Sequence, residues 1–157
     1  MNKNQRGFTL VELLVVVAII ALLSTLAVVS LNGIRERARD TKRISDMDAV
    51  RNAWELVKNE NGDYKPDNFC FAGKKINECT GGALEEFLPT LKNVIDPLGT
   101  AYCDEAQCKA STGSCAYSVQ KLLPSAFSVN FRLEKGAANH TEPGCYQLTE
   151  KGIQKLQ

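Results

Sequence analysis

The sequence predicts an α+β chain in which a long N-terminal helix packs on a small antiparallel β-sheet with disulfide-bonded loops. Residues 13–31 contain no charged side chain, although charged residues make up 24% of the whole chain. Apolar residues then recur every three or four positions to residue 57, which is typical of an amphipathic helix. Short alternating segments and all six cysteines follow. We therefore expect a ladle-shaped molecule with the helix as its handle.

These composition changes divide the 157 residues into four segments. We predict a leader peptide at 1–7, a transmembrane helix at 8–31, and an amphipathic continuation of that helix at 32–61. Residues 62–157 then form an extracytoplasmic globular domain on which helix 32–61 packs. One compact domain plus one extra element agrees with the usual size of domains.

The apolar segment from Phe8 to Leu31 is long enough to cross a bilayer as a helix. At about 1.5 Å per residue it spans roughly 36 Å, against a hydrocarbon core of about 30 Å. A secretory signal peptide has its small-residue cleavage site after the apolar stretch, but here the small residue Gly7 precedes it. The basic residues Lys3 and Arg6 place the N-terminus in the cytoplasm and the chain from residue 32 outside.

Glu12 is the one charged residue inside the start of this segment. A carboxylate is disfavoured in the bilayer core, so Glu12 needs either a partner there or access to the membrane surface. In one interpretation it reaches the headgroups and stabilises the helix N-terminus, where anions are favoured. In the other, cutting before Phe8 frees an amine, and Glu12 pairs with the amine of a neighbouring subunit. The residue pattern alone leaves both open.

Residues 6–13 read RGFTLVEL. This resembles the processing site of type IV prepilins and type II secretion pseudopilins, with a basic leader, Gly before the cut, Phe after it and Glu fifth in the mature chain. The resemblance implies that a prepilin peptidase cleaves after Gly7 and methylates the amine of Phe8, and that Glu12 aids assembly. It also implies a pilin-like fold, polymerisation through the transmembrane helix 8–31 and an inner-membrane assembly platform. The partners would be other copies of the chain and other pilins, in an extracellular or periplasmic fibre.

The amphipathic segment presents an apolar face at Ile34, Ala38, Ile44, Met47, Val50, Trp54 and Val57. We interpret the charged residues between them as a solvated surface: Arg35, Arg37, Arg39, Asp40, Lys42, Arg43, Asp46, Asp48 and Arg51. The letters NENG at 59–62 predict the end of the helix, because glycine readily adopts the left-handed conformation that closes one.

The C-terminal domain begins with a turn-rich stretch at 64–79, followed by a predicted short helix at 84–92. Residues 116–119, 127–133 and 145–149 alternate between apolar and polar, which predicts half-buried antiparallel strands. We expect the sheet and the amphipathic helix to bury one core, formed by Trp54, Val57, Phe127, Val129, Phe131 and Leu133.

Six cysteines lie in the C-terminal part of the chain: Cys70, Cys79, Cys103, Cys108, Cys115 and Cys145. An even number downstream of an export-like N-terminus predicts disulfides formed in an oxidising compartment. Zinc is disfavoured because no CxxC occurs and His140 is the single histidine. Proximity favours a Cys70–Cys79 pair, and six cysteines leave fifteen connectivities open.

Residues 96–102 read DPLGTAY, which resembles the Asp-Pro-Trp-Gly loop of major pseudopilins with Leu98 in the Trp position. In that branch the resemblance implies a possible calcium ion, for which Asp96, Asp104 and Glu105 could supply oxygen ligands. No EF-hand-like loop is present, and the cysteine-rich insert departs from the short pseudopilin loop. We therefore predict no cofactor, with calcium as the one candidate.

Charge and motifs argue against other functions. The formal net charge is +1, from 19 basic and 18 acidic residues, so nucleic acid is a poor candidate partner. No hydrolase, nucleotide-binding or metalloprotease motif occurs, and His140 has no evident nucleophile. The alternative to a fibre subunit is a single-pass anchored extracellular binding domain, disulfide-bonded and not polymerising. The sequence does not separate a pilus from a secretion or DNA-uptake pseudopilus, nor a major from a minor subunit.

Overall fold

The computed structural model describes residues 7–65, 67–110 and 115–157, without the side chains of 27–30. The chain divides into two compact units, Met1–Arg35 and Glu36–Gln157. In the described residues, one long helix, α1 (Leu10–Asn61), is followed by four short helical segments and four strands. The helical segments are η1 (Ile76–Glu78), α2 (Ala83–Phe87), η2 (Leu91–Asn93) and α3 (Glu105–Ala110). The predicted α+β fold is confirmed.

Helix α1 covers almost the whole range expected from 8 to 61. It contains no proline, which would remove an intrahelical hydrogen bond, and it is helical throughout 10–61. Gly62 ends it with a φ of 82°, and its N–H donates to the carbonyl of Lys58 at 2.8 Å. This is the predicted glycine stop, because only a residue without a Cβ adopts that conformation at little cost.

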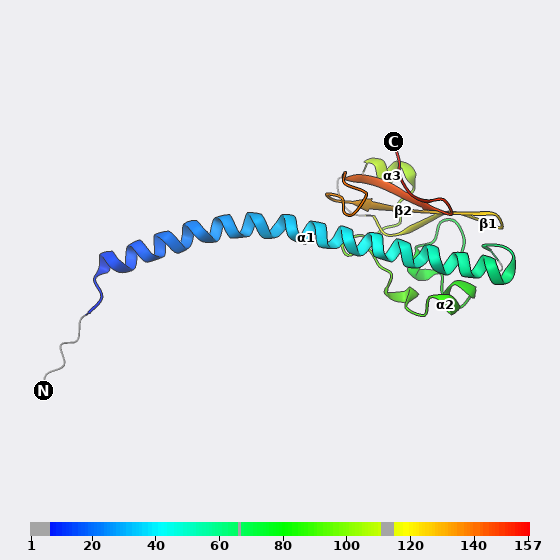
Figure 1. Cartoon of the computed structure of the whole chain (residues 1–157), viewed down its shortest axis with the longest axis horizontal. Coiled ribbons are helices and arrows are strands. Elements are labelled where there is room, and N and C mark those ends of the chain that lie inside the picture. Colours follow the sequence, from blue (N-terminus) through cyan, green and yellow to red (C-terminus); the bar gives the residue numbers. More distant parts are fainter. Residues whose placement is uncertain (1–6, 66, 111–114) are drawn as a thin grey trace, which may run out of the picture. The chain divides into compact units, whose positions relative to one another are not determined.

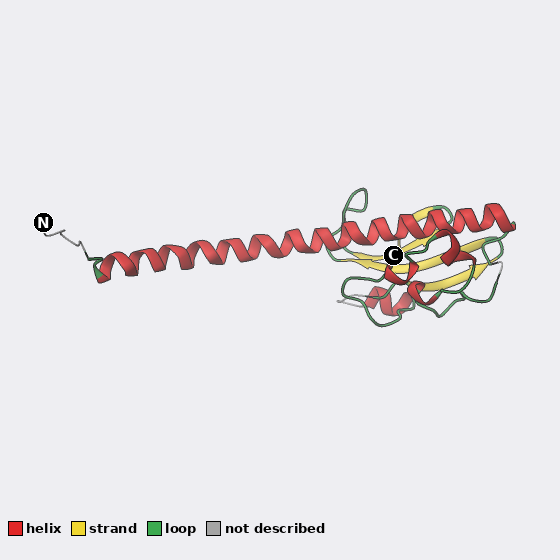
Figure 2. Ribbon diagram, turned by 90° about the horizontal axis from the view of Figure 1, so that it is seen from below, coloured by secondary structure: helices red, strands yellow, loops and turns green. Residues whose placement is uncertain are grey.

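The sheet is an antiparallel meander in the order β1-β2-β3-β4 (Figures 1 and 2). Its strands are β1 (Ser118–Leu123), β2 (Ala126–Leu133), β3 (Gly144–Thr149) and β4 (Gly152–Lys155). The predictions for β2 and β3 are confirmed, whereas β1 begins two residues later than the predicted segment 116–119. Strand β4 was not predicted, because four residues are too few to show an alternation.

Two helical predictions need correction. The helix expected at 84–92 ends at Phe87, and the chain makes a separate turn at Leu91–Asn93, because Pro89 cannot continue a helical hydrogen-bond ladder. Helix α3 was not predicted. It carries a single buried residue, Cys108, so it has no apolar stripe that the sequence could reveal.

The main core lies between one face of the sheet and the part of α1 that belongs to Glu36–Gln157. All six residues of the predicted core are buried there. The rings of Trp54 and Phe127 lie 4.4 Å apart, and Tyr64 contacts Phe127 edge-on at 5.0 Å. The prediction succeeds because a helical period and a strand period each mark one apolar face, and the two faces bury each other.

The opposite face of the sheet is covered by the cysteine-rich insert (Figure 1). Cys108 on α3 is joined to Cys145 on β3, and Cys103 is joined to Cys115. Arg132 of β2 donates to the carbonyl of Cys108 at 2.9 Å. The third disulfide, Cys70–Cys79, is the pair that proximity favours, and with it all six cysteines are paired.

Candidate functional site

Gly7 and Phe8, the residues expected at the processing site, precede helix α1 and lie outside any helix or strand. The side chain of Phe8 is 84% exposed, and no atom outside its neighbours lies within 4 Å of a Cβ placed on Gly7. The basic residues Lys3 and Arg6 of the expected leader lie outside the described residues. The bond between Gly7 and Phe8 is thus in an open, non-helical segment.

Glu12 forms a capping box with Thr9 at the start of α1. One oxygen of the Glu12 carboxylate accepts hydrogen bonds from the backbone N–H of Thr9 at 2.9 Å and from its hydroxyl at 2.7 Å. The hydroxyl oxygen of Thr9 in turn accepts from the N–H of Glu12 at 3.2 Å. This role of Thr9 was not predicted, although Thr-x-x-Glu before an apolar run is the usual signature of such a cap.

The apolar part of α1 exposes nearly all its side chains. Every large apolar residue described between Phe8 and Leu26 is at least 47% exposed. A groove of 310 Å³ runs along this surface, lined by Leu14, Val15, Ala18, Ile19, Leu22 and Leu23. By length and composition α1 could cross a membrane. An apolar surface of this extent requires lipid or protein to cover it, because its exposure to water is costly.

The charged face of α1 is not wholly a solvated surface, and this prediction is wrong for two residues. Asp40 and Arg43 are completely buried, and so is nearly all of Asp96. The guanidinium of Arg43 donates to Asp96 at 2.6 Å from Nε, and from Nη1 to Asp40 at 2.8 Å and to Glu134 at 2.5 Å. A charge can be buried when it is paired and hydrogen-bonded on several sides, as Arg43 is here.

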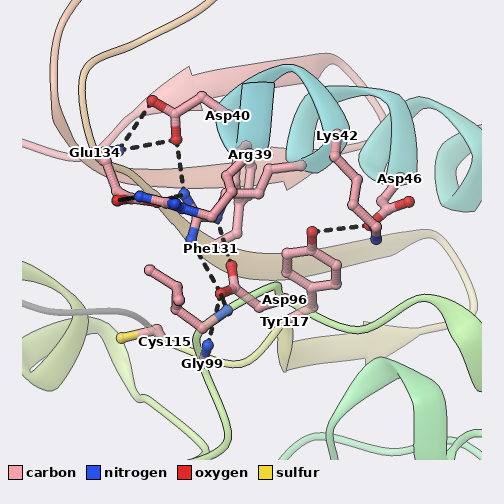
Figure 3. Close-up of polar contacts among 12 residues, drawn as sticks. Arg39, Asp40, Lys42, Asp46, Asp96, Gly99, Cys115, Tyr117, Phe131 and Glu134 are labelled. Atoms are coloured by element: carbon pink, nitrogen blue, oxygen red, sulfur yellow. Dashed lines mark hydrogen bonds and ion pairs between the residues drawn. The ribbon is translucent and has the colours of Figure 1, made fainter. Parts of the chain in front are cut away.

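Asp40 connects α1 to the turn after β2 (Figure 3). Its carboxylate accepts the backbone N–H groups of Glu134, Lys135 and Gly136 at 2.8–3.1 Å, besides the bond from Arg43. Figure 3 shows the bonds to Glu134. Gly136 has a φ of 91°, and a Cβ there would collide with the backbone of His140 and Thr141. This one side chain therefore satisfies three amides that would otherwise lie partly buried without a partner.

Glu134 lies on the side of the cluster that is nearest to solvent. It accepts hydrogen bonds from Arg39 at 2.7 and 2.5 Å as well as from Arg43. The bonds from Arg39 lower the pKa of Glu134, and so does the nearby Arg43 guanidinium, while burial opposes them. Burial disfavours the charge of Arg43, yet its hydrogen bonds to Asp96 raise the pKa of Arg43 above its ordinary value.

A second polar contact beside this cluster joins α1 to Tyr117, the residue directly before β1. The hydroxyl of Tyr117 donates to Asp46 at 2.9 Å, and Lys42 pairs with the same carboxylate at 2.5 Å (Figure 3). Burial and the neighbouring charge of Asp46 raise the pKa of Tyr117, so this phenol stays protonated and remains a donor at physiological pH. Lys42 and Asp46 are four residues apart, so their ion pair lies along one face of α1.

The candidate calcium ligands are engaged separately. Asp96 binds Arg43 and also accepts the N–H groups of Leu98 at 2.9 Å and Gly99 at 2.7 Å, which shapes the Asp-Pro-Leu-Gly turn. Asp104 accepts the N–H of Gln107 at the start of α3, and Glu105 pairs with Lys109 along that helix. Among the residues that the structure describes, no three acidic, histidine or cysteine side chains group to hold a metal ion.

We expect the charge cluster to stabilise the fold less in acid, and the contribution of Glu134 is one part of this effect that can be measured. Because its folded pKa is below the unfolded value of 4.5, its contribution is present above that pH and is lost as the pH falls through the folded pKa. Glu134→Gln should cost about 1.5–3 kcal/mol at pH 7, and this gap to the wild type should shrink by pH 3. Urea unfolding at both pH values measures it. A gap that is the same at pH 7 and pH 3 contradicts the prediction.

The N-terminal part of the chain matches a known family model. Residues 2–28 match the family model described as the prokaryotic N-terminal methylation motif, which confirms the resemblance drawn from residues 6–13. The chain is 44% identical over 67 residues to the type II secretion system core protein G of Escherichia coli (strain K12), covering 43% of this chain and 46% of that protein.

Other relatives resemble a similar share of the chain. The type II secretion system core protein G of Aeromonas hydrophila is 40% identical over 63 residues, covering 40% of this chain and 44% of its own. The type IV wide pilus major component PilA4 of Thermus thermophilus is 37% identical over 62 residues, covering 40% of this chain and 47% of its own. The similarity thus spans less than half of each of these relatives. No solved structure matches this chain.

Proposed function

We propose that this chain is a structural subunit of a type IV pilus or a type II secretion-like pseudopilus, and not an enzyme. The observation that carries the proposal is the methylation motif at residues 2–28 at the head of an exposed apolar helix. The relatives, a secretion system core protein and a pilus component, agree with both forms of fibre.

Processing after Gly7 by a prepilin peptidase, with methylation of the new amine on Phe8, is the first step we propose. The open segment before α1 supports it, because a peptidase must bind an extended chain rather than a helix at the bond it cuts. The cut removes residues 1–7 and leaves the apolar segment on the mature protein. Before assembly that segment, residues 8–31, would anchor the chain in the inner membrane with its N-terminus in the cytoplasm.

Assembly would then exchange lipid for other copies of the same helix. The apolar groove along Leu14, Val15, Ala18, Ile19, Leu22 and Leu23 supports this step, because helices pack by placing the ridges of one into the grooves of another. The domain of residues 62–157, with helix 32–61 packed on it, would lie outside the cytoplasm. The three disulfides support an oxidising location for it.

Glu12 can act in this assembly as a charge, as a helix cap, or as both, and variants separate the roles. Glu12→Ala removes both. Glu12→Gln keeps a side chain that can close a capping box but carries no charge. Thr9→Ala keeps the charge and removes the hydroxyl that Glu12 contacts. If the charge pairs with a neighbouring amine, Glu12→Ala and Glu12→Gln both lose fibres at least tenfold, while Thr9→Ala keeps them.

The test is intact mass and N-terminal sequencing of protein from sheared surface fibres, with membrane-retained protein quantified for each variant. A mature chain that begins at methylated Phe8 supports the proposal. If Glu12→Gln assembles and Thr9→Ala does not, the cap rather than the charge is needed. An uncut chain that stays in the membrane and is indifferent to Glu12 overturns the proposal in favour of an anchored, non-polymerising domain.

A further inference from the structure

The buried cluster around Arg43 has the layout of a cation site that already contains its cation. Three carboxylates from distant parts of the chain, Asp40, Asp96 and Glu134, converge on one guanidinium. We infer that Arg43 is the built-in cation of this domain, and that these three carboxylates form a site shaped for a guanidinium and not for a divalent metal ion. The inference is independent of whether the chain assembles into a fibre.

The hydrogen bonds match the planar fork of a guanidinium. Nε and Nη2 of Arg43 point to the two oxygens of Asp96 at 2.6 and 3.1 Å, a side-on bidentate pair. Nη1 bridges the carboxylates of Asp40 and Glu134 at 2.8 and 2.5 Å. Four carboxylate oxygens are thereby arranged around the edge of one flat group. An ammonium is a compact point charge and could not reach all of them.

The charges explain why a cation is needed at all. Without Arg43, the three carboxylates and the guanidinium of Arg39 would have a net charge of −2. One calcium ion would balance this charge. Calcium, however, requires six to eight oxygens at about 2.3–2.6 Å from a single centre. In the described part of the chain these carboxylates do not form such a group. Asp40 and Asp96 are also held in place by backbone amides, which resists their moving inward.

The experiment removes the guanidinium of Arg43 by mutation and supplies free cations in solution. Arg43→Ala removes the atoms that ethylguanidinium contains, so that this ion is the matched probe, and ethylammonium and CaCl₂ are the controls. The full chain in detergent micelles is unfolded thermally with each ion at millimolar concentration and with EDTA. We expect ethylguanidinium to raise the Tm of Arg43→Ala by about 3 °C or more, since a ligand that binds only the folded state stabilises it. Ethylammonium and calcium should leave it unchanged.

The wild type and a second variant complete the test. The Tm of the wild type should be the same in calcium and in EDTA, because Arg43 already occupies the site. The Tm of Arg43→Lys should not change with any of the ions. The ammonium of the lysine occupies the site, although it cannot reach all four carboxylate oxygens. Calcium raising the Tm of the wild type, or stabilising Arg43→Ala where ethylguanidinium does not, overturns the inference. The wild-type comparison decides even if Arg43→Ala does not fold.

Discussion

Replacing Arg43 by methionine should lower the free energy of unfolding by about 3–5 kcal/mol, as expected for one partner removed from a buried ion pair. Methionine replaces the aliphatic part of Arg43 but not the guanidinium, so the loss is mainly electrostatic. The carboxylates of Asp40 and Asp96 would stay buried without their cation. Asp40 cannot simply turn to solvent, because it also holds the backbone amides of the turn after β2. Urea unfolding followed by the fluorescence of Trp54 measures the change.

Lys42→Met is the matched control, because it removes a cation from the next position of the same helix. The side chain of Lys42 is 46% exposed, and its pair with Asp46 is of the solvated kind that contributes only about 0.2–1 kcal/mol. The large difference between the two variants is the prediction. Equal losses from Arg43→Met and Lys42→Met would show that the buried cluster does not hold the domain together.

Removing the Cys108–Cys145 disulfide by a double change to alanine should cost about 4 kcal/mol. Its cysteines are 37 residues apart, and the loss follows from the chain entropy that the cross-link removes from the unfolded state. The bond also ties α3 to β3 beside the contact between Arg132 and the carbonyl of Cys108. The insert should therefore loosen from its face of the sheet, which hydrogen exchange in residues 103–110 would report.

The double change of Cys70 and Cys79 is the comparison for this prediction. These cysteines are only 9 residues apart, and the same entropic relation gives about 2.5 kcal/mol. Both pairs are buried, so the loss of apolar contact is similar in the two variants. Urea unfolding under non-reducing conditions ranks them. If the Cys70–Cys79 variant is the less stable of the two, loop length does not govern the contribution of these disulfides.

Features that depend on local pattern were predictable from the sequence. The extent of α1 follows from its helical period and its glycine stop at Gly62. The core of Trp54, Phe127 and their neighbours follows from one apolar face in each element. The motif of residues 6–13 could be recognised from the order of its residues alone. Thr9 could also have been found this way, because its capping box is a local signal that lies in the same eight residues.

The sequence by itself determined the apolar helix, the alternating strands and the N-terminal motif, because each is a repeat or a spacing between near neighbours. Only the tertiary structure decided which cysteines pair at long range, where α3 and β4 lie, and which charges of α1 are buried. Arg43 and Lys42 are adjacent basic residues on one helix, and nothing local distinguishes them. What separates them is that Asp96 and Glu134, 53 and 91 positions away, reach Arg43 in the folded chain. Burial of a charge depends on such distant partners, and these are defined only once the chain has folded.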